Sequence, residues 1–323
     1  MSKTNSAKTA PSKLKTASRK KTFFLTTMVL PGAIWLVLLR YLPMIGILIA
    51  FKNYKVYTPK PNLINNIIHS DWSGLQNFKF LVASNDAGIM VRNTLGYNIV
   101  FIVLGLIISV AFAIMLNEIT HKFVAKTYQT LMFFPYFLSW VVASYFVYAF
   151  LSPTSGLIPS MQKSMGVTKV IDWYNTPGPW PFILVICNIW KNTGYSTVLY
   201  LSAITGIDAT QYEAANIDGA TKWQQIRYIT IPHLKTMILI LFIMNVGKIF
   251  NADFGLFYQV PMAAGLLRSA TMVIDTYVYT AMTATGSVGM STAAGLLQNV
   301  LGFVCIMLAN TIVKKVDSDS ALF

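Results

Sequence analysis

The stretch TLGYNIVFIVLGLIISVAFAIML, residues 94–116, contains no charged side chain. As an α-helix that rises 1.5 Å per residue, a stretch of this length crosses the roughly 30 Å hydrocarbon core of a bilayer. Backbone polar groups have no water partner in lipid, so a helix is the structure that an isolated apolar segment adopts there. This stretch therefore predicts a transmembrane helix and decides the fold class.

The rest of the chain follows the same pattern. Of its 323 residues 55% are hydrophobic and 11% are charged, and the mean hydropathy is +0.56. A soluble domain carries about a quarter charged residues. Five further apolar segments cover residues 23–51, 131–151, 180–204, 237–260 and 291–313. We predict an all-α membrane protein with six transmembrane helices over residues 23–316, kinked near Pro43 and Pro135. The first segment is longer than the core of a signal peptide and is expected to remain as an anchor.

The net charge is +14, and the distribution of the basic residues along the chain predicts the orientation of the protein in the membrane. Residues 1–22 carry seven basic side chains in a Ser- and Thr-rich sequence, which predicts a disordered cytoplasmic tail beside anionic lipid. With the N-terminus inside, the predicted cytoplasmic segments carry more Lys and Arg than the outer loops, so both termini are expected in the cytoplasm. Residues 317–323 would then form a short C-terminal tail. This distribution favours a membrane surface over nucleic acid as the partner of the positive charge.

The loop between the fourth and fifth predicted spans, residues 206–234, reads GIDATQYEAANIDGATKWQQIRYITIPHL. Asp208 or Thr210 can cap a helix that follows it. Gly219 permits a sharp turn, and Pro232 is suited to the first turn of the next helix. The orientation above places this loop in the cytoplasm.

The helix expected in this loop presents small side chains, Ala214 and Ala215, that allow a partner to approach closely. Glu213 and Asp218 offer negative charge to a basic partner. From these residues alone, an ordinary amphipathic loop at the membrane interface is an equal alternative.

The spacing within the loop resembles the EAA motif of ABC importer permeases, E-A-A-x3-G-x9-I-x-L-P. The match runs from Glu213 to Pro232, with Ile231 where Leu is usual. The resemblance implies that this helix docks in a cleft of a separate ATPase. The coupling residues carried over are Glu213, Ala214, Ala215, Asp218, Gly219, Ala220 and Pro232.

Further segments resemble the sugar-importer permeases, in particular their oligosaccharide and polysaccharide branch. They include WSGLQNFKFL, QTLMFFPYFLSWVV, IWKNTGYSTVLYLSAITGID and VIDTYVYTA. Thr280 departs from the pattern, because that branch often has Arg after the TYVY element. The resemblance implies the type I (MetI-like) permease fold in a bacterial cell membrane. It also implies a second homologous permease, two ATP-binding subunits, an extracellular substrate-binding protein and a carbohydrate substrate.

No enzymatic chemistry is expected in this chain. The sequence contains no G-x-x-x-x-G-K-[ST] phosphate-binding loop, so ATP and Mg²⁺ are expected on the partner ATPase. The three histidines, His69, His121 and His233, are scattered over loops. We therefore predict no catalytic residue, metal site or cofactor here.

Two polar faces within the predicted spans are candidates for a substrate path. Polar groups in a span usually face the bundle interior or a water-filled path. They could bind sugar hydroxyls, although interhelical hydrogen bonding is the structural alternative. Trp140, Tyr145 and Tyr148 could stack on sugar rings or simply pack. The six polar residues are Asn188, Lys191 and Asn192 in the fourth span, and Asn245, Lys248 and Asn251 in the fifth.

Three other functions remain open at this point. A permease for amino acids or peptides would share the coupling loop. A secondary transporter would need a buried carboxylate, for which Asp253 is the candidate within a span, and it would leave the loop without a purpose. A membrane scaffold would explain the missing catalytic groups but would also leave the loop unexplained.

Overall fold

The computed structural model describes residues 12–58, 62–79, 83–84, 86–167, 170–317 and 321–322. These residues form helices joined by loops, together with a short antiparallel ladder of β1 (Lys52–Asn53) and β2 (Asp71–Trp72). The predicted all-α class is therefore confirmed as a mostly helical fold.

Four continuous helical runs in the described residues are long and apolar enough to cross a membrane. They match the first, second, fifth and sixth predicted spans. The first combines α1 (Ser12–Leu36), the π-helix η1 (Val37–Tyr41) and the 3-10 helix η2 (Leu42–Phe51). The others are α4 (Ala87–Asn117), the run formed by α10 (Lys222–Gln225), the π-helix η4 (Ile226–Thr230) and α11 (Ile231–Val246), and α15 (Val288–Val316).

The third predicted span, which was expected to be kinked near Pro135, is broken into two helices. It consists of α5 (Lys122–Phe137) and α6 (Trp140–Leu151), which meet at a bend of 101°. Pro135 lies in the last turn of α5, and the side chain of Ser139 accepts a hydrogen bond from the backbone of Val142 to start α6. The chain therefore ends one helix and caps another instead of continuing.

The fifth predicted span also ends early. Helix α11 stops at Val246, and a turn leads to the short α12 (Phe254–Gln259) instead of continuing to residue 260. The fourth span matches α8 (Trp180–Thr205), whose Asn and Lys residues make it less apolar than the four runs above. Six crossings and the inside location of both termini remain predictions.

The remaining helices lie in the connections. They are α2 (Leu63–His69) and η3 (Gln76–Phe78) after the first span, α7 (Leu157–Ser164) after α6, and α9 (Ala209–Ile217) before α10. Between α12 and α15 lie η5 (Gly265–Leu267), α13 (Arg268–Thr271) and α14 (Ile274–Thr285).

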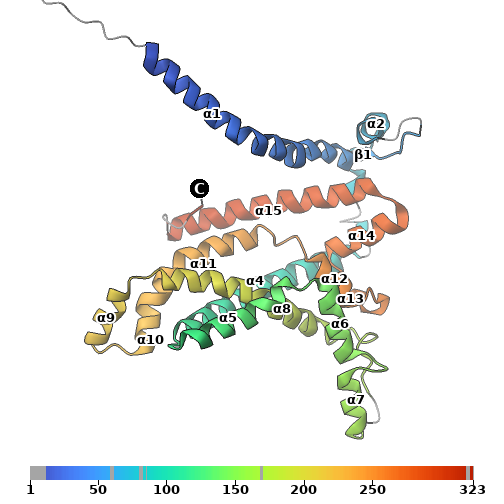
Figure 1. The fold of residues 1–323 in the computed structure, drawn as a ribbon. Coiled ribbons are helices and arrows are strands. Elements are labelled where there is room, and N and C mark those ends of the chain that lie inside the picture. Colours follow the sequence, from blue (N-terminus) through green and yellow to red (C-terminus); the bar gives the residue numbers. More distant parts are fainter. Residues whose placement is uncertain are drawn as a thin grey trace, which may run out of the picture.

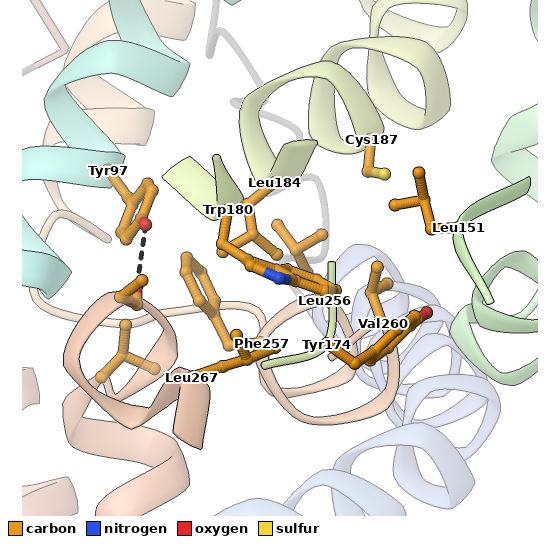
Figure 2. Close-up of a cluster of buried hydrophobic side chains, with 12 residues drawn as sticks. Tyr97, Leu151, Tyr174, Trp180, Leu184, Cys187, Leu256, Phe257, Val260 and Leu267 are labelled. Atoms are coloured by element: carbon orange, nitrogen blue, oxygen red, sulfur yellow. Dashed lines mark hydrogen bonds between the residues drawn. The ribbon is translucent and has the colours of Figure 1, made fainter. Parts of the chain in front are cut away.

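The centre of the fold is α8, which packs against α4 along its length and against α5. At Gly194, α8 and α5 approach so closely that a Cβ atom on this glycine would overlap the carbonyl of Met132 in α5. Figure 2 shows the largest apolar cluster, where Trp180 and Leu184 of α8 meet Leu256 of α12 and Val260, which follows α12. A second cluster joins the opposite ends of α4, α8 and α11.

Ion pairs bring together segments that were predicted on the same side of the membrane. Glu118, after α4, lies 3.2 Å from Lys222 of α10, and Lys235 of α11 lies 2.8 Å from Asp317 after α15. These are all predicted cytoplasmic segments. An ion pair between Asp86 and Arg268 joins two of the three predicted outer loops, residues 52–92 and 261–290. Each of these ion pairs therefore joins segments that were predicted on the same side of the membrane.

Helix α1 extends away from the bundle (Figure 1), and residues 21–45 are exposed throughout. The tail that was predicted to be disordered differs from the structure over residues 12–22, because these residues form the start of α1. Residues 1–11 of the tail lie outside the described residues. The C-terminal part of this first run, η2, packs against α15.

Candidate functional site

The EAA segment forms α9, and local capping fixes where this helix begins. Asp208 is the N-cap, and its side chain accepts a hydrogen bond of 3.0 Å from the backbone N–H of Thr210. This N–H, supported by the Thr210 side chain, holds the pKa of Asp208 below its ordinary value. The cap therefore carries a negative charge beside the helix N-terminus, which the helix dipole favours.

Gly219 ends α9 in the left-handed conformation, with φ of +76°. The N–H of Ala220 donates to the carbonyl of Ala215 at 2.9 Å, and the N–H of Gly219 donates to Asn216 at 3.1 Å. These two bonds form a Schellman motif, in which glycine at this position avoids a steric penalty. The motif reverses the chain directly after Asp218, as the sequence predicted for Gly219.

The reversed chain packs back on α9 as a helical hairpin. A capping box of Thr221 and Gln224 starts α10. Gln225 is buried, and its amide donates to the side chain of Asn216 at 2.5 Å. The hydroxyls of Tyr212 and Thr230 lie 2.9 Å apart. These contacts join α9 to α10 and η4, so the hairpin is a defined unit and not a loose loop.

The face of the hairpin is open to a partner. Helix α9 has no buried residue, and Ile217 is 88% exposed. Within the described residues neither Glu213 nor Asp218 forms an ion pair, so both carboxylates are available to an external cation. Figure 1 shows α9 and α10 projecting from one end of the molecule.

Pro232 lies in the first turn of α11, as expected for a residue without a backbone N–H. The helix does not begin afresh there, however. It continues from α10 through five residues of π-helix, Ile226–Thr230. The hairpin is therefore joined to α11 by one helical run from Lys222 to Val246.

A cavity of about 640 Å³ lies between α4, α8, α11 and the turn that follows α11. Five of the six polar residues predicted for a substrate path line it, which brings the two predicted faces together. They are Asn188, Asn192, Asn245, Lys248 and Asn251.

Lys191 does not belong to this lining. Its side chain is buried, and its amine donates to the backbone carbonyls of Leu138 at 2.5 Å and Tyr136 at 2.8 Å, with Pro135 at 3.4 Å. These carbonyls sit at and just after the C-terminal end of α5, where carbonyl groups lack partners within the helix, and that of Pro135 also accepts from the backbone N–H of Leu138. The substrate-path assignment of Lys191 is therefore corrected to a clamp on the bend.

The aromatic residues at the cavity differ from those predicted. They include Tyr136 and Tyr195, whose rings stack at 4.7 Å between centroids and 14° between planes. Trp140, Tyr145 and Tyr148 lie outside the described lining. All three sit on α6, which the bend turns away from the direction of a straight third span.

Asn98 and Asp253 also line the cavity, although the sequence analysis did not assign them to the substrate path. Asn98 of α4 donates to the carbonyls of Ile249 at 2.8 Å and Asn251 at 3.1 Å, so it fixes the turn after α11. An Asn within the predicted apolar span 94–116 was a usable signal. Asp253 also lines the cavity and caps α12, a position that depends on the early end of α11.

Comparison with known proteins identifies the family. Residues 102–317 match the model of the binding-protein-dependent transport system inner membrane component. The matched region contains α5, α8, the hairpin and the last helix, and most of the cavity lining.

Relatives that match most of the chain support the same family. The chain is 33% identical over 292 residues to the polygalacturonan/rhamnogalacturonan transport system permease protein YteP of Bacillus subtilis (strain 168), covering 90% of this chain and 88% of the relative. It is 31% identical over 308 residues to Protein LplB of the same organism, covering 94% and 92%. In a crystal structure of a bacterial alginate ABC transporter, complexed with an alginate pentasaccharide-bound periplasmic protein, a chain with 29% identity superposes with a TM-score of 0.80. That match covers 93% of this chain and 97% of the other. The chain belongs to the family of binding-protein-dependent transport system inner membrane components.

Proposed function

We propose that this chain is the membrane-spanning subunit of an ATP-driven importer of oligosaccharides or polysaccharides. It forms part of the translocation path for a saccharide that an external binding protein delivers. A separate ATPase supplies the energy through the hairpin of α9 and α10. The observation that carries this proposal is the exposed, internally braced hairpin that holds the EAA residues at one end of the fold.

The hairpin is suited to transmit force because it is rigid and exposed. Ala214 and Ala215 allow a partner surface to approach closely, and Glu213 can pair with a cation on the ATPase. When two ATPases close on ATP, they would carry the hairpins of two permeases together. The continuous run from Lys222 to Val246 would pass this movement to the turn beside the cavity. Such a rigid-body movement would expose the cavity to each side of the membrane in turn.

The substrate class is inferred from the relatives and from the cavity. The names of YteP and of the alginate transporter specify saccharides, and an amide-rich lining with stacked tyrosines suits sugar hydroxyls and sugar faces. These observations favour a saccharide over a peptide or an amino acid.

The exposed helix α1 supports the presence of a second permease subunit. Its apolar residues are unpaired within this chain, and interior polar residues such as Asn245 need an environment other than lipid. In our proposal the protein crosses a bacterial cell membrane six times, with both termini in the cytoplasm. ATP and Mg²⁺ would bind to the ATPase and not to this chain.

Uptake in the native cell tests the proposal. Deletion of this chain should abolish accumulation of the labelled saccharide that its binding protein captures, and the wild-type chain should restore it. A chain with the substitution Glu213→Ala should insert in the membrane but restore little uptake. Undiminished saccharide uptake in the deletion strain would contradict the proposal.

A further inference from the structure

Two lysines lie in the predicted interior of the membrane on neighbouring elements, and the structure treats them differently. The amine of Lys191 is satisfied by three backbone carbonyls at the end of α5. The cation at Lys191 therefore has its compensation within the fold, and its burial needs no ligand.

Lys248 has no such compensation. It lines the cavity, and within the described part of the chain its ammonium group has neither a hydrogen-bond acceptor nor an ion-pair partner. A cation inside a membrane protein is costly and is retained where it serves a ligand path or pairs with a counter-charge. The lining around it offers neutral amides and one carboxylate.

That carboxylate, Asp253, is already engaged. One oxygen accepts from the indole of Trp140 at 2.6 Å, and the other accepts from the backbone of Gly255 at 3.0 Å and Leu256 at 3.4 Å. It lies beyond 4 Å from the amine of Lys248, because the two form no salt bridge. The cavity thus holds the unpaired ammonium group of Lys248, while both oxygens of Asp253 are hydrogen-bonded to other groups of the protein.

The backbone that carries Lys248 is firmly held. Asn98 binds the turn from α4, as described above. Asp275 of α14 accepts from the backbone N–H of Ala252 at 2.8 Å, and Gln298 of α15 donates to the carbonyl of Phe250 at 2.7 Å. Three elements therefore position the turn, while the Lys248 amine stays unbonded. The turn therefore presents the exposed Lys248 side chain from a fixed backbone position.

We propose that Lys248 binds a carboxylate of the transported saccharide, so that the substrate class is an anionic, uronate-bearing oligosaccharide. Neighbouring Asn245 and Asn251 would bind its hydroxyls, and the carboxylate would supply the counter-charge that the fold omits. This inference rests on the proposed function and deepens it, because it assigns the charge selectivity of the path to one residue of this chain.

Transport by the complete importer in proteoliposomes tests the assignment. The probes are oligogalacturonate fragments and the same fragments after reduction of their carboxyl groups to neutral sugars. Lys248→Gln should lower uptake of the acidic probe about tenfold, as expected for the loss of one charge-assisted hydrogen bond. Lys248→Arg should retain most of it. Uptake of the neutral probe, however slow, should not fall. Lys163→Gln, on the exposed α7, is the matched control for loss of one positive charge.

The outcomes separate the two proposals. An unchanged ratio of acidic to neutral uptake in Lys248→Gln, or an equal loss of both, would overturn the role of Lys248 while leaving saccharide import intact. Failure of the wild-type importer to transport either probe or any saccharide carried by its binding protein would overturn the proposed function itself. As a second measurement, a carbodiimide-activated oligogalacturonate should form an amide with Lys248 and not with Lys191, as read by mass spectrometry. If the probe labels the assembled importer at other residues but not at Lys248, that result would contradict the inference.

Discussion

The indole N–H of Trp140 donates a hydrogen bond of 2.6 Å to the carboxylate of Asp253. Trp140 is the first residue of α6, and Asp253 caps α12, so this bond joins the bent third segment to the turn after α11. Gly255 completes the junction, because a Cβ atom there would overlap the Trp140 ring. The cavity wall and the bend are therefore mechanically connected.

Replacing Gly255 tests how tightly this junction is packed. Gly255→Ala forces the Trp140 ring to move and should destabilise the purified protein by about 1–3 kcal/mol, the usual cost of overpacking. Gly265→Ala is the matched control, because no atom lies within 4 Å of an added Cβ there. Thermal unfolding in detergent should show a lower Tm for Gly255→Ala alone. Equal Tm values for both variants would show that the junction is loose.

The clamp at Lys191 predicts a structural phenotype. Lys191→Met leaves the carbonyls of Tyr136 and Leu138 without their donor, at a cost of about 2–3 kcal/mol for lost bonds to a charged group. The variant should accumulate poorly and unfold at a lower temperature. Lys248→Met, which breaks no bond within the described chain, should accumulate normally. Normal stability of Lys191→Met with altered uptake would instead return Lys191 to the substrate path.

The turn at Gly219 predicts a coupling phenotype. Gly219→Leu places an L-residue at φ of +76°, at a cost of about 1–2 kcal/mol, and adds a side chain on the exposed hairpin. The protein should insert normally but lose ATPase binding and uptake. Gly219→Asn should retain more function, because Asn tolerates this conformation. Normal uptake by Gly219→Leu would contradict the coupling role of the turn.

The cap at Asp208 predicts a dependence on pH. Because the folded protein lowers the pKa of Asp208 below 3.8, the ionised cap stabilises α9 at neutral pH. Its contribution is lost as the pH falls below about 3.8 and through the lowered folded value. Hydrogen exchange of the peptide covering α9, corrected for intrinsic rates, should therefore lose protection in acid. Asp208→Asn, whose cap does not titrate, should lose less. Identical profiles for the two proteins would exclude the carboxylate as the cap.

The sequence predicted the helical class and the coupling helix because their signals are local. Long apolar runs specify helices in lipid, and Asp208 and Gly219 specify the ends of α9 by their own backbone chemistry. The bend at Leu138 is different. Pro135 predicted a kink there, but the bend of 101° is also held by a lysine that lies 53 residues later in the chain, which the local sequence does not reveal.

Contacts between segments far apart in the sequence also explain why only some of the residues predicted for the substrate path line the cavity. Helical spacing placed Asn188, Lys191 and Asn192 on one side of α8, and two of the three do line the cavity. The third residue, Lys191, points away from the cavity lining because its amine binds carbonyls at the end of α5. The early end of α11 likewise depends on Asn98, Asp275 and Gln298, which come from three other helices.

Co-purification in mild detergent tests the central claim most directly. The tagged chain, isolated from its native cell with nucleotide present, should bring down a second permease of this family and an ATP-binding subunit. The complex should hydrolyse ATP faster when the saccharide-loaded binding protein is added, and Gly219→Leu should recover the permease without the ATPase. Recovery of the wild-type chain alone, with no nucleotide-dependent partner, would contradict the account.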